Sequence, residues 1–401
     1  MKNILIAIRS IFKKGRHNVM KIVSLGIGLA VGLVLIAKVY FEQSYDDFYP
    51  DRDRVYQVWA KYQQNGGELK DYPQTSGGIA PTMQQQIPEI ETVTRYTSFG
   101  DWTFTMTDTK MKYSGRCIIA DSCFFDILPR PMLIGNAKEV LSTPMYVLVS
   151  SRIAKNIGGD VIGKNFTVDS SPGRTMTIGG VFEEVPENSH SRYDVIVSMA
   201  SAGRFMWEGS PTNMLGNDRY ISYVKLHKGV NPLALEEQVH TFVNSYFPPE
   251  EQQKTGFNIG FSFHELDGLH KELPQVKRMT WILSLLAFAL IFTAVMNYIL
   301  IVISSIVNRS KEVAVHKCYG ASENNIHGMM FGEALVHIVL SLILALLLIL
   351  AFRGTVEELL ATSLDSLLLS NGSLVLLGIC ILVFFVSGFM PGSLYARIPV
   401  A

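Results

Sequence analysis

The chain has 401 residues, which is enough for more than one domain. Lys plus Arg and Asp plus Glu each number 35, so the sequence lacks the basic excess that is typical of nucleic-acid-binding proteins. The hydrophobic content of 48% is ordinary for a soluble protein, but the apolar residues are concentrated in a few long runs, and these runs decide the class of protein.

Residues 1–19 form a basic segment at the start of the chain. Five of its apolar side chains share one helical face: Ile4, Leu5, Ile8, Ile11 and Phe12. This pattern is typical of a helix that lies in the inner membrane surface, and it also fits a plain extension of the next helix. The sequence leaves both alternatives open.

Four apolar runs are long enough to cross a bilayer core, which needs roughly 20 residues of helix. We predict membrane spans over 20–43, 277–307, 329–352 and 372–396. Lys38 is the one charged residue between Ile22 and Phe41 of the first run, and we expect its ammonium group to extend to the nearby interface. Because no A-x-A-like cleavage site follows this run, we predict a retained span and not a signal peptide.

The charges that flank the spans predict their orientation. Lys and Arg precede the first span, and mainly acidic residues follow it, so the positive-inside rule places the N-terminus in the cytoplasm. The spans then alternate. Residues 44–275 and 353–371 are expected outside, whereas 308–328 and the C-terminus are expected in the cytoplasm.

Residues 44–275 have a mixed, polar composition that predicts one large α+β domain inserted between the first and second spans. Alternating apolar residues predict strands near 56–62, 102–106, 145–149, 175–182, 193–197 and 220–226. Helices are predicted over 151–157 and 234–247, the second with Leu235, Val239, Phe242 and Val243 on one face. A turn is expected at 171–173. Cys117 and Cys123 either form a disulfide or remain free thiols.

One segment of this domain looks like a nucleotide-binding loop. Residues 158–165 read G-x-x-x-x-G-K-N, but a P-loop needs Ser or Thr at the last position and a strand before the glycines. Here a helix is predicted before and a strand after, so we interpret the segment as a glycine-rich turn. The sequence also has no hydrolase motif and no zinc-ligand spacing. We therefore expect no catalytic residues, no metal site and no cofactor on this chain.

Two features of the spans indicate close helix packing. Gly28 and Gly32 form a G-x-x-x-G motif in the first span, which allows a second helix to approach closely. Asn297 lies within the second span, where we expect its amide to form a hydrogen bond with a neighbouring helix.

The segment 308–328 is short, charged and compatible with helix. Gly320 is a predicted helix stop, and Ser322 is a predicted N-cap of the helix that follows. The segment is either an ordinary cytoplasmic loop or a coupling helix that binds a cytosolic partner.

This segment resembles the motif R-x-x-E-[IV]-x-[VI]-x-[KR]-x-x-G-A-[ST] of FtsX-like, MacB-like (type VII) ABC transporter permeases. The residues that we assign to ATPase coupling are Arg309, Lys311, Glu312, Val313, Val315, Lys317, Gly320, Ala321 and Ser322. Shorter stretches at 44–48, 54–56, 124–126, 162–164 and 181–186 are similar to the MacB-like periplasmic core domain of Bacteroidetes-type members.

The resemblance implies that residues 277–401 form an FtsX-like permease domain of the inner membrane. Such a permease is not itself an enzyme. It works as a homodimer or pseudo-dimer with a cytosolic ABC ATPase dimer, which binds the ATP and magnesium, and a periplasmic adaptor or hydrolase can join it. ATP hydrolysis then moves the periplasmic domain by mechanotransmission. The work is export or extraction of a periplasmic substrate such as a peptide, an antimicrobial or a lipoprotein.

Two alternatives remain after the resemblance. The chain is either a single-copy permease or half of a longer two-copy permease, because many Bacteroidetes-type relatives carry the plan twice. The alternative function is that of a membrane-anchored sensor or a cell-wall hydrolase regulator that acts through a partner.

Overall fold

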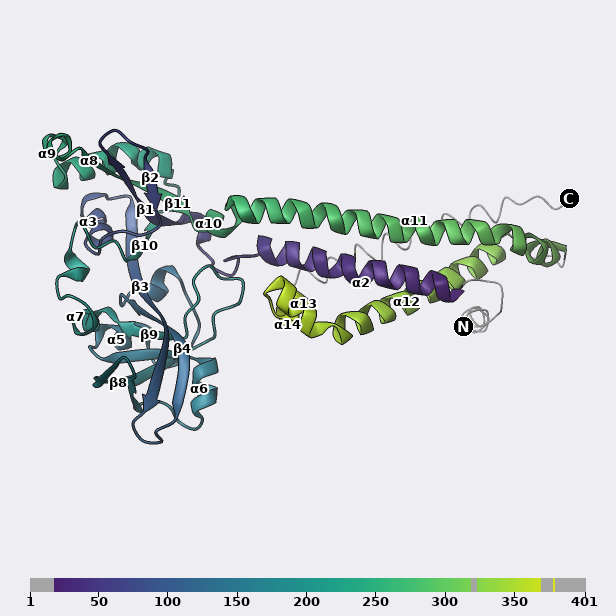
Figure 1. Ribbon diagram of the computed structural model, residues 1–401, viewed down its shortest axis with the longest axis horizontal. Helices are drawn as coiled ribbons and strands as arrows, with labels where there is room; N and C mark the ends of the chain where they lie inside the picture. Colours follow the sequence, from purple (N-terminus) through teal and green to yellow (C-terminus); the bar gives the residue numbers. More distant parts are fainter. Residues whose placement is uncertain (1–17, 319–322, 369–377, 379–401) are drawn as a thin grey trace. The chain divides into compact units, whose positions relative to one another are not determined.

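A computed structural model describes residues 18–318, 323–368 and 378 of the chain (Figure 1). It divides the chain into two compact units. Residues 45–272 form one unit, here named the sheet unit, and residues 1–44 with 273–401 form the other, here named the helical unit. The predicted helix near the N-terminus, the fourth span and the corner at 320–322 fall outside the described residues.

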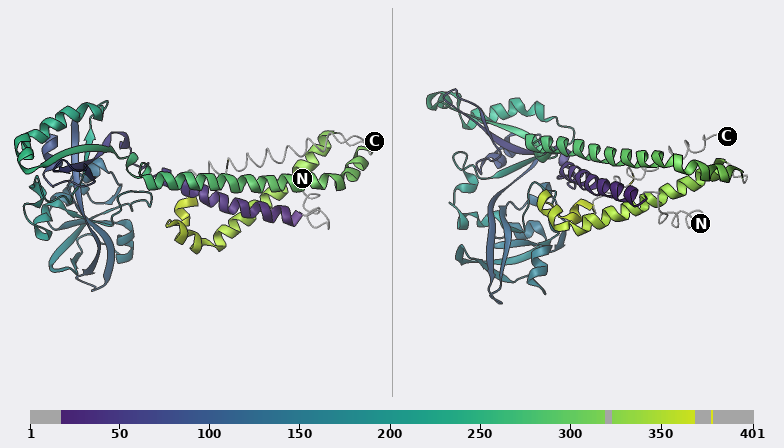
Figure 2. Two further views of the ribbon diagram at one scale, coloured as in Figure 1. Left: turned by 45° about the horizontal axis from the view of Figure 1, so that its top comes forward. Right: turned by 45° about the vertical axis from the view of Figure 1, so that its right-hand side comes forward.

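The helical unit is built on three long helices. These are α2 (Asn18–Gln43), α11 (Pro274–Cys318) and α12 (Glu323–Ala351). Helix α2 packs against both of the others, as Figures 1 and 2 show. Their shared core includes Leu25 and Leu29 of α2, Ala294 of α11 and Ile338 of α12.

The described residues contain two helices that are long and apolar enough to cross a membrane, 18–43 and the 274–301 part of α11. A third span results only if Leu335–Ala351 and Arg353–Leu360, which meet at 70°, are taken as one bent span. The first two predicted spans thus correspond to such helices. The four-span count is not established, because the predicted fourth span lies outside the described part.

The segment 353–371, predicted as a short loop, contains two helices, α13 (Arg353–Leu360) and α14 (Leu364–Leu368). They fold back, so that α14 contacts α2. The side chain of Lys38 is buried, and the expectation that its ammonium extends to the interface stays a prediction. The ammonium lies 2.6 Å from Glu42 Oε1 and donates to Thr362 Oγ1 at 2.8 Å. These partners, one turn along α2 and just after α13, hold the charge inside the packed helices.

The sheet unit contains one 11-stranded sheet in the order β11-β1-β10-β3-β4-β9-β6-β8-β5, with β2 on β1 and β7 on β3 and β8. The pairs β4–β9 and β6–β8 are parallel, and the other pairs are antiparallel. The strands are β1 (Val55–Gln64), β2 (Lys70–Tyr72), β3 (Ile90–Met106), β4 (Lys112–Ala120), β5 (Met132–Ile134), β6 (Tyr146–Ser150), β7 (Asn165–Val168), β8 (Ser171–Phe182), β9 (Val195–Ser198), β10 (Ile221–Leu226) and β11 (Phe257–Glu265).

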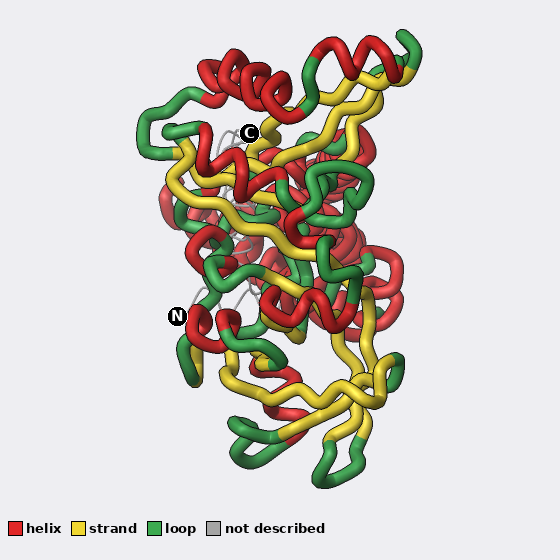
Figure 3. The backbone as a smooth tube through the Cα atoms, turned by 90° about the vertical axis from the view of Figure 1, so that its left-hand side faces the viewer, coloured by secondary structure: helices red, strands yellow, loops and turns green. Residues whose placement is uncertain are grey.

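Short helices flank this sheet, as Figure 3 shows with helices in red and strands in yellow. The α-helices are α3 (Ile79–Gln86), α4 (Phe124–Ile127), α5 (Ala137–Ser142), α6 (Ser151–Ile157), α7 (Ala202–Phe205), α8 (Glu236–Tyr246), α9 (Pro249–Thr255) and α10 (Gly268–Lys271). The 3-10 helices are η1 (Arg52–Arg54), η2 (Met199–Ser201), η3 (Ser210–Thr212) and η4 (Pro232–Leu235).

Three apolar clusters form the core of the sheet unit. One lies under α3 and α8 and includes Met83 and Phe242. A second includes Phe104 of β3 and Phe166 of β7. The third, around Phe124, joins α4 to the middle of the sheet. Because all three lie within residues 45–272, this unit has a core of its own.

Most predicted elements of this unit are confirmed. A strand overlaps each predicted strand segment, although β9 begins only at Val195, and α6 has the predicted bounds. The helix predicted over 234–247 is divided into η4 and α8, and the apolar residues of its predicted face are buried. The turn expected at 171–173 is wrong. Strand β8 already begins at Ser171, and the two residues 169 and 170 make the turn, because Val168 pairs directly with Ser171. Cys117 and Cys123 are free thiols.

Candidate functional site

The predicted coupling segment lies at the end of α11. This helix runs for 45 residues, which corresponds to a length of about 67 Å at 1.5 Å per residue. A bilayer core is about 30 Å thick, so the helix is long enough to leave the membrane without a break. The structure places six predicted coupling residues in its last turns: Arg309, Lys311, Glu312, Val313, Val315 and Lys317.

The backbone on both sides of the predicted corner is helical. Helix α11 is described to Cys318, and α12 is described from Glu323. The side chain of Val315 is 54% exposed, so it is open to a partner in the single chain. Gly320, Ala321 and Ser322 lie outside the described residues, and their roles stay predictions.

The G-x-x-x-G face of α2 lies against α11 of the same chain. A Cβ atom placed on Gly28 would overlap the Cβ of Ala294. One placed on Gly32 would lie 2.5 Å from Ile291 Cγ1, far inside van der Waals contact. The two glycines therefore allow α2 and α11 to approach closely. Asn297 of α11 is exposed in the single chain, and its predicted hydrogen bond to a neighbouring helix stays a prediction.

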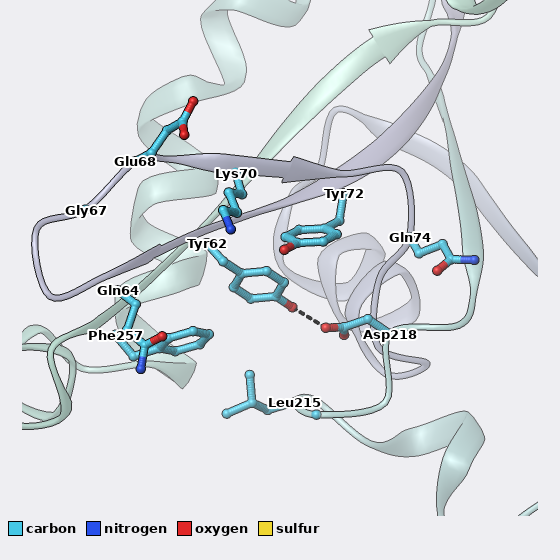
Figure 4. Close-up of a pocket in the computed structure, with 11 residues that line it drawn as sticks. Tyr62, Gln64, Gly67, Glu68, Lys70, Tyr72, Gln74, Leu215, Asp218 and Phe257 are labelled. Carbon is cyan, nitrogen blue, oxygen red and sulfur yellow. Dashed lines mark hydrogen bonds between the residues drawn. The ribbon is translucent and has the colours of Figure 1, made fainter.

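A pocket of about 760 Å³ lies on the sheet unit, at a place that the sequence did not indicate. Its floor is one face of β2, β1 and β11, which present Tyr72, Tyr62 and Phe257 (Figure 4). Tyr62 lies opposite Lys70 in the β1–β2 register, so Lys70 is on this face too. The loop that carries Leu215 and Asp218 forms the wall.

The aromatic rings of the floor contact one another. The centroid of the Tyr62 ring lies 5.3 Å from that of Phe257 and 5.6 Å from that of Tyr72. Such spacings are those of interacting aromatic pairs. Tyr72 is 42% exposed, so part of its ring faces the open pocket.

Asp218 accepts hydrogen bonds from two hydroxyl groups, and the one from Tyr62 connects the wall to the floor. Tyr62 donates to Asp218 Oδ2 at 2.6 Å, as Figure 4 shows, and Ser76 donates to Oδ1 at 2.5 Å. Burial, and secondly the bond to Asp218, raise the pKa of Tyr62, so the phenol keeps its proton and donates at neutral pH. Both donors are neutral, and the negative charge of the carboxylate therefore remains in the pocket.

A second polar cluster of the sheet unit centres on His190. Its Nδ1 lies 2.8 Å from Asp46 Oδ2, and its Nε2 lies 2.5 Å from the hydroxyl of Tyr223. Asp46 and Tyr223 are buried, and Ser189 also donates to Asp46. These contacts tie the segment just after α2 to β10, and we interpret the cluster as structural.

Sequence periodicity could have found only part of the pocket. Alternation along β1 places Tyr62 on a definite face, but the partners of that face come from residues 70–72, 215–218 and 257. Only the pairing of β1 with β2, β10 and β11 brings these segments together.

Comparisons with known proteins cover both units. Residues 20–242 match the model of the MacB-like periplasmic core domain, and residues 284–400 match that of the FtsX-like permease C-terminal region. A crystallised domain of a proposed permease protein from Porphyromonas gingivalis is 32% identical over 54% of this chain and 91% of that domain, with a TM-score of 0.50. No curated protein matches the sequence.

Two further solved structures are more distant. The periplasmic region of MacB from Actinobacillus actinomycetemcomitans is 14% identical over 51% of this chain and 87% of that one, with a TM-score of 0.36. The extracellular domain of the noncanonic ABC-type transporter YknZ from Gram-positive bacteria is 10% identical, with 51% and 98% covered and a TM-score of 0.36.

Proposed function

Because this chain belongs to the FtsX-like permeases of ABC transporters that carry a MacB-like periplasmic core domain, we propose that it converts ATP hydrolysis on partner subunits into motion of its sheet unit. Permeases of this family work in the inner membrane with ABC ATPase partners. The chain itself binds no nucleotide in this proposal, and the ATP and magnesium belong to the partner.

The continuity of α11 carries the proposal. One uninterrupted helix runs from Pro274, two residues after the sheet unit ends, to Cys318 in the coupling segment. A helix transmits axial displacement and rotation along its length because each backbone hydrogen bond links one turn to the next. A movement of the coupling segment is therefore delivered to the end of the sheet unit.

The sheet unit is attached to the helices at both of its ends. Helix α2 ends at Gln43, two residues before the unit begins, and α11 follows it. The Gly28 face packs α2 on α11, so the two attachments belong to one packed helical body. We propose that this body moves the sheet unit in a homodimer or pseudo-dimer and so exports or extracts a periplasmic substrate such as a peptide.

The first test asks whether the coupling segment binds the ATPase. We expect the triple variant Lys311→Glu, Glu312→Lys, Lys317→Glu to lose co-purification with the ATPase, because it reverses three charges of the segment. The matched control makes the same changes at exposed residues of the sheet unit: Lys228→Glu, Glu251→Lys and Lys254→Glu. Unchanged ATPase association in the first variant, with the chain folded, would remove the coupling role.

The second test separates binding from transmission. A four-residue Gly-Ser insertion after Leu273 makes the connection between the sheet unit and α11 longer and more flexible without changing the coupling segment. We expect ATPase association to persist while the ATP-dependent change in protease sensitivity of the sheet unit is lost. The same insertion in the exposed turn at 108–110 is the control. If the insertion after Leu273 left the ATP response intact, transmission through α11 would be wrong.

A further inference from the structure

We propose that the pocket lined by Tyr62, Tyr72, Phe257, Lys70, Leu215 and Asp218, here named the tyrosine pocket, binds an organic cation carried on an apolar stem. The chemical class is an alkylammonium or guanidinium group attached to an aliphatic or aromatic part. This site goes beyond the proposed force transmission and does not depend on it.

The carboxylate of Asp218 presents a negative charge to a ligand in the pocket. A carboxylate can accept about four hydrogen bonds, and the bonds from Tyr62 and Ser76 use two of these positions. No ion pair to Asp218 is present within the part of the chain that the structure describes. The two hydroxyl groups fix the carboxylate in position and leave acceptor capacity for a donor that enters the pocket. A cationic donor forms the stronger bond.

The aromatic floor provides a second kind of attraction for a cation. A cation is attracted to the face of a tyrosine or phenylalanine ring when it lies within about 6 Å of the ring centre. Three rings from three neighbouring strands lie together in the floor, and the middle one also bonds Asp218 (Figure 4). A cation at Asp218 therefore lies close to the hydroxyl of Tyr62, at the edge of this aromatic floor.

The lining also explains why the expected ligand is organic and not a metal ion. Calcium and magnesium need several oxygen ligands from carboxylates, carbonyls or water. The lining contains two carboxylates, Asp218 and Glu68, and the Glu68 side chain is directed away from the rings (Figure 4). No group of three residues able to hold a metal is found among the described residues. Leu215 is 45% exposed and, with Phe257, supplies apolar surface for a stem.

The positive charge of Lys70 repels a cation in the pocket, so changing this residue tests the proposal. Its side chain projects from the same sheet face as Tyr62, opposite to it in the strand pair, and it forms no ion pair within the described residues. Glu68 is directed away from the rings (Figure 4). Removal of the Lys70 ammonium should therefore raise the affinity for a cation, whereas removal of the Asp218 charge should lower it.

The experiment uses the full chain in lipid nanodiscs and measures binding by isothermal titration calorimetry. One probe is acetyl-phenylalanyl-arginine amide, and its neutral match is acetyl-phenylalanyl-citrulline amide. We expect the arginine probe to bind at least about tenfold more tightly, which is the effect of one well-formed charge-assisted contact. Benzyltrimethylammonium is the small-molecule arm, and its affinity relative to the arginine probe tells whether the pocket prefers a free cation or a peptide side chain.

Four variants test the assignment. Asp218→Asn keeps one acceptor oxygen, enough for one of the two hydroxyl groups, and should abolish the preference for arginine over citrulline. Tyr72→Ala, which changes an exposed ring, should weaken the arginine probe several-fold, and Lys70→Gln should strengthen it several-fold. Asp101→Asn, an exposed carboxylate on β3, should change nothing.

The proposal is overturned if both peptides and benzyltrimethylammonium fail to bind, if arginine and citrulline bind equally, or if folded Asp218→Asn keeps the preference. Thermal unfolding of each variant establishes that it is folded. Since no ATPase takes part in the measurement, a negative result removes this site and leaves the proposed permease role in place.

Discussion

At the scale of single residues, glycine decides how closely the helices of the membrane region pack. Gly28 of α2 lies where any Cβ would meet Ala294, whereas Gly354 of α13 has no heavy atom within 4 Å of the same position. Alanine is favoured over glycine in a helix by about 1 kcal/mol. An alanine at either site gains the same helix propensity, but only an alanine at Gly28 meets a neighbouring helix. Comparing the two substitutions therefore isolates the effect of the contact between α2 and α11.

We expect Gly28→Ala to destabilise the chain by about 1–3 kcal/mol, because the methyl group overpacks the contact with α11. Gly354→Ala should be neutral or slightly stabilising. Thermal unfolding in detergent measures both. Equal behaviour of the two variants would contradict the close approach of α2 and α11.

Lys38 gives a second prediction at this scale. Lys38→Met keeps an apolar stem of similar length but removes the ammonium from Glu42 and Thr362. Because a buried carboxylate then loses its cation, we expect a loss of about 3 kcal/mol in unfolding free energy. The double variant Lys38→Met, Glu42→Leu should recover most of it, since it buries no charge. A single variant as stable as the wild type would show that the pair contributes nothing.

At the scale of elements, local sequence patterns predicted the buried face of a helix, whereas strand pairing decided the position of a turn. The buried face over 234–247 was predicted because helical spacing alone places Leu235, Val239, Phe242 and Val243 together; Leu235 ends η4 and the other three lie in α8. The β7–β8 turn was misplaced because composition favoured 171–173, whereas the pairing of Val168 with Ser171 sets the turn two residues earlier. Turn chemistry indicates that the chain reverses nearby, but the register of the strands fixes where.

The junction of η1 with β10 gives a pH-dependent prediction. Asp51 accepts hydrogen bonds from Lys225 at 2.6 Å and from Arg54 at 3.1 Å, and these bonds lower its pKa below the ordinary value of 3.8. A carboxyl group whose pKa is lower in the folded state stabilises the fold above its unfolded pKa. This stability is lost as the pH falls through the folded pKa.

We therefore expect Asp51→Asn to lower the unfolding free energy at pH 7 by about 0.5–1 kcal/mol, a modest value because the group is partly exposed. The difference from wild type should shrink below about pH 4. Denaturant unfolding at several pH values measures it, with Asp101→Asn as control. A difference that stays constant across this range would show that the charge of Asp51 is not its cause.

At the scale of the whole molecule, the sheet unit has its own core and its own strand at the edge of β1. The sheet unit contains three apolar clusters of its own, and β11 pairs with β1 from Tyr56 to Gln64. The family match for the core domain ends at residue 242, before β11. The edge of β1 is therefore covered by a strand outside the matched region.

We expect residues 45–272 alone to fold and to unfold in one cooperative transition. The shorter fragment 45–247 lacks β11 and leaves the β1 edge and the Phe242 cluster open, so it should aggregate or unfold at a much lower temperature. Circular dichroism and size-exclusion chromatography distinguish the two. Equal stability of the fragments would show that β11 is not part of the folding unit.

The sequence by itself determined the class of this protein and most of its elements. Apolar runs of about 20 residues, helical spacing over 234–247 and strand alternation in β1 are patterns of residues close together in the chain, so they can be recognised without the fold. The coupling motif likewise lies in consecutive residues, at 309–322. Only the tertiary structure decided that Lys38 is buried beside Glu42 and Thr362, and that α11 continues without a break from Pro274 to Cys318. The tyrosine pocket also needed the fold, because Tyr62, Asp218 and Phe257 are far apart in the sequence and meet only through the pairing of β11 with β1 and the loop before β10.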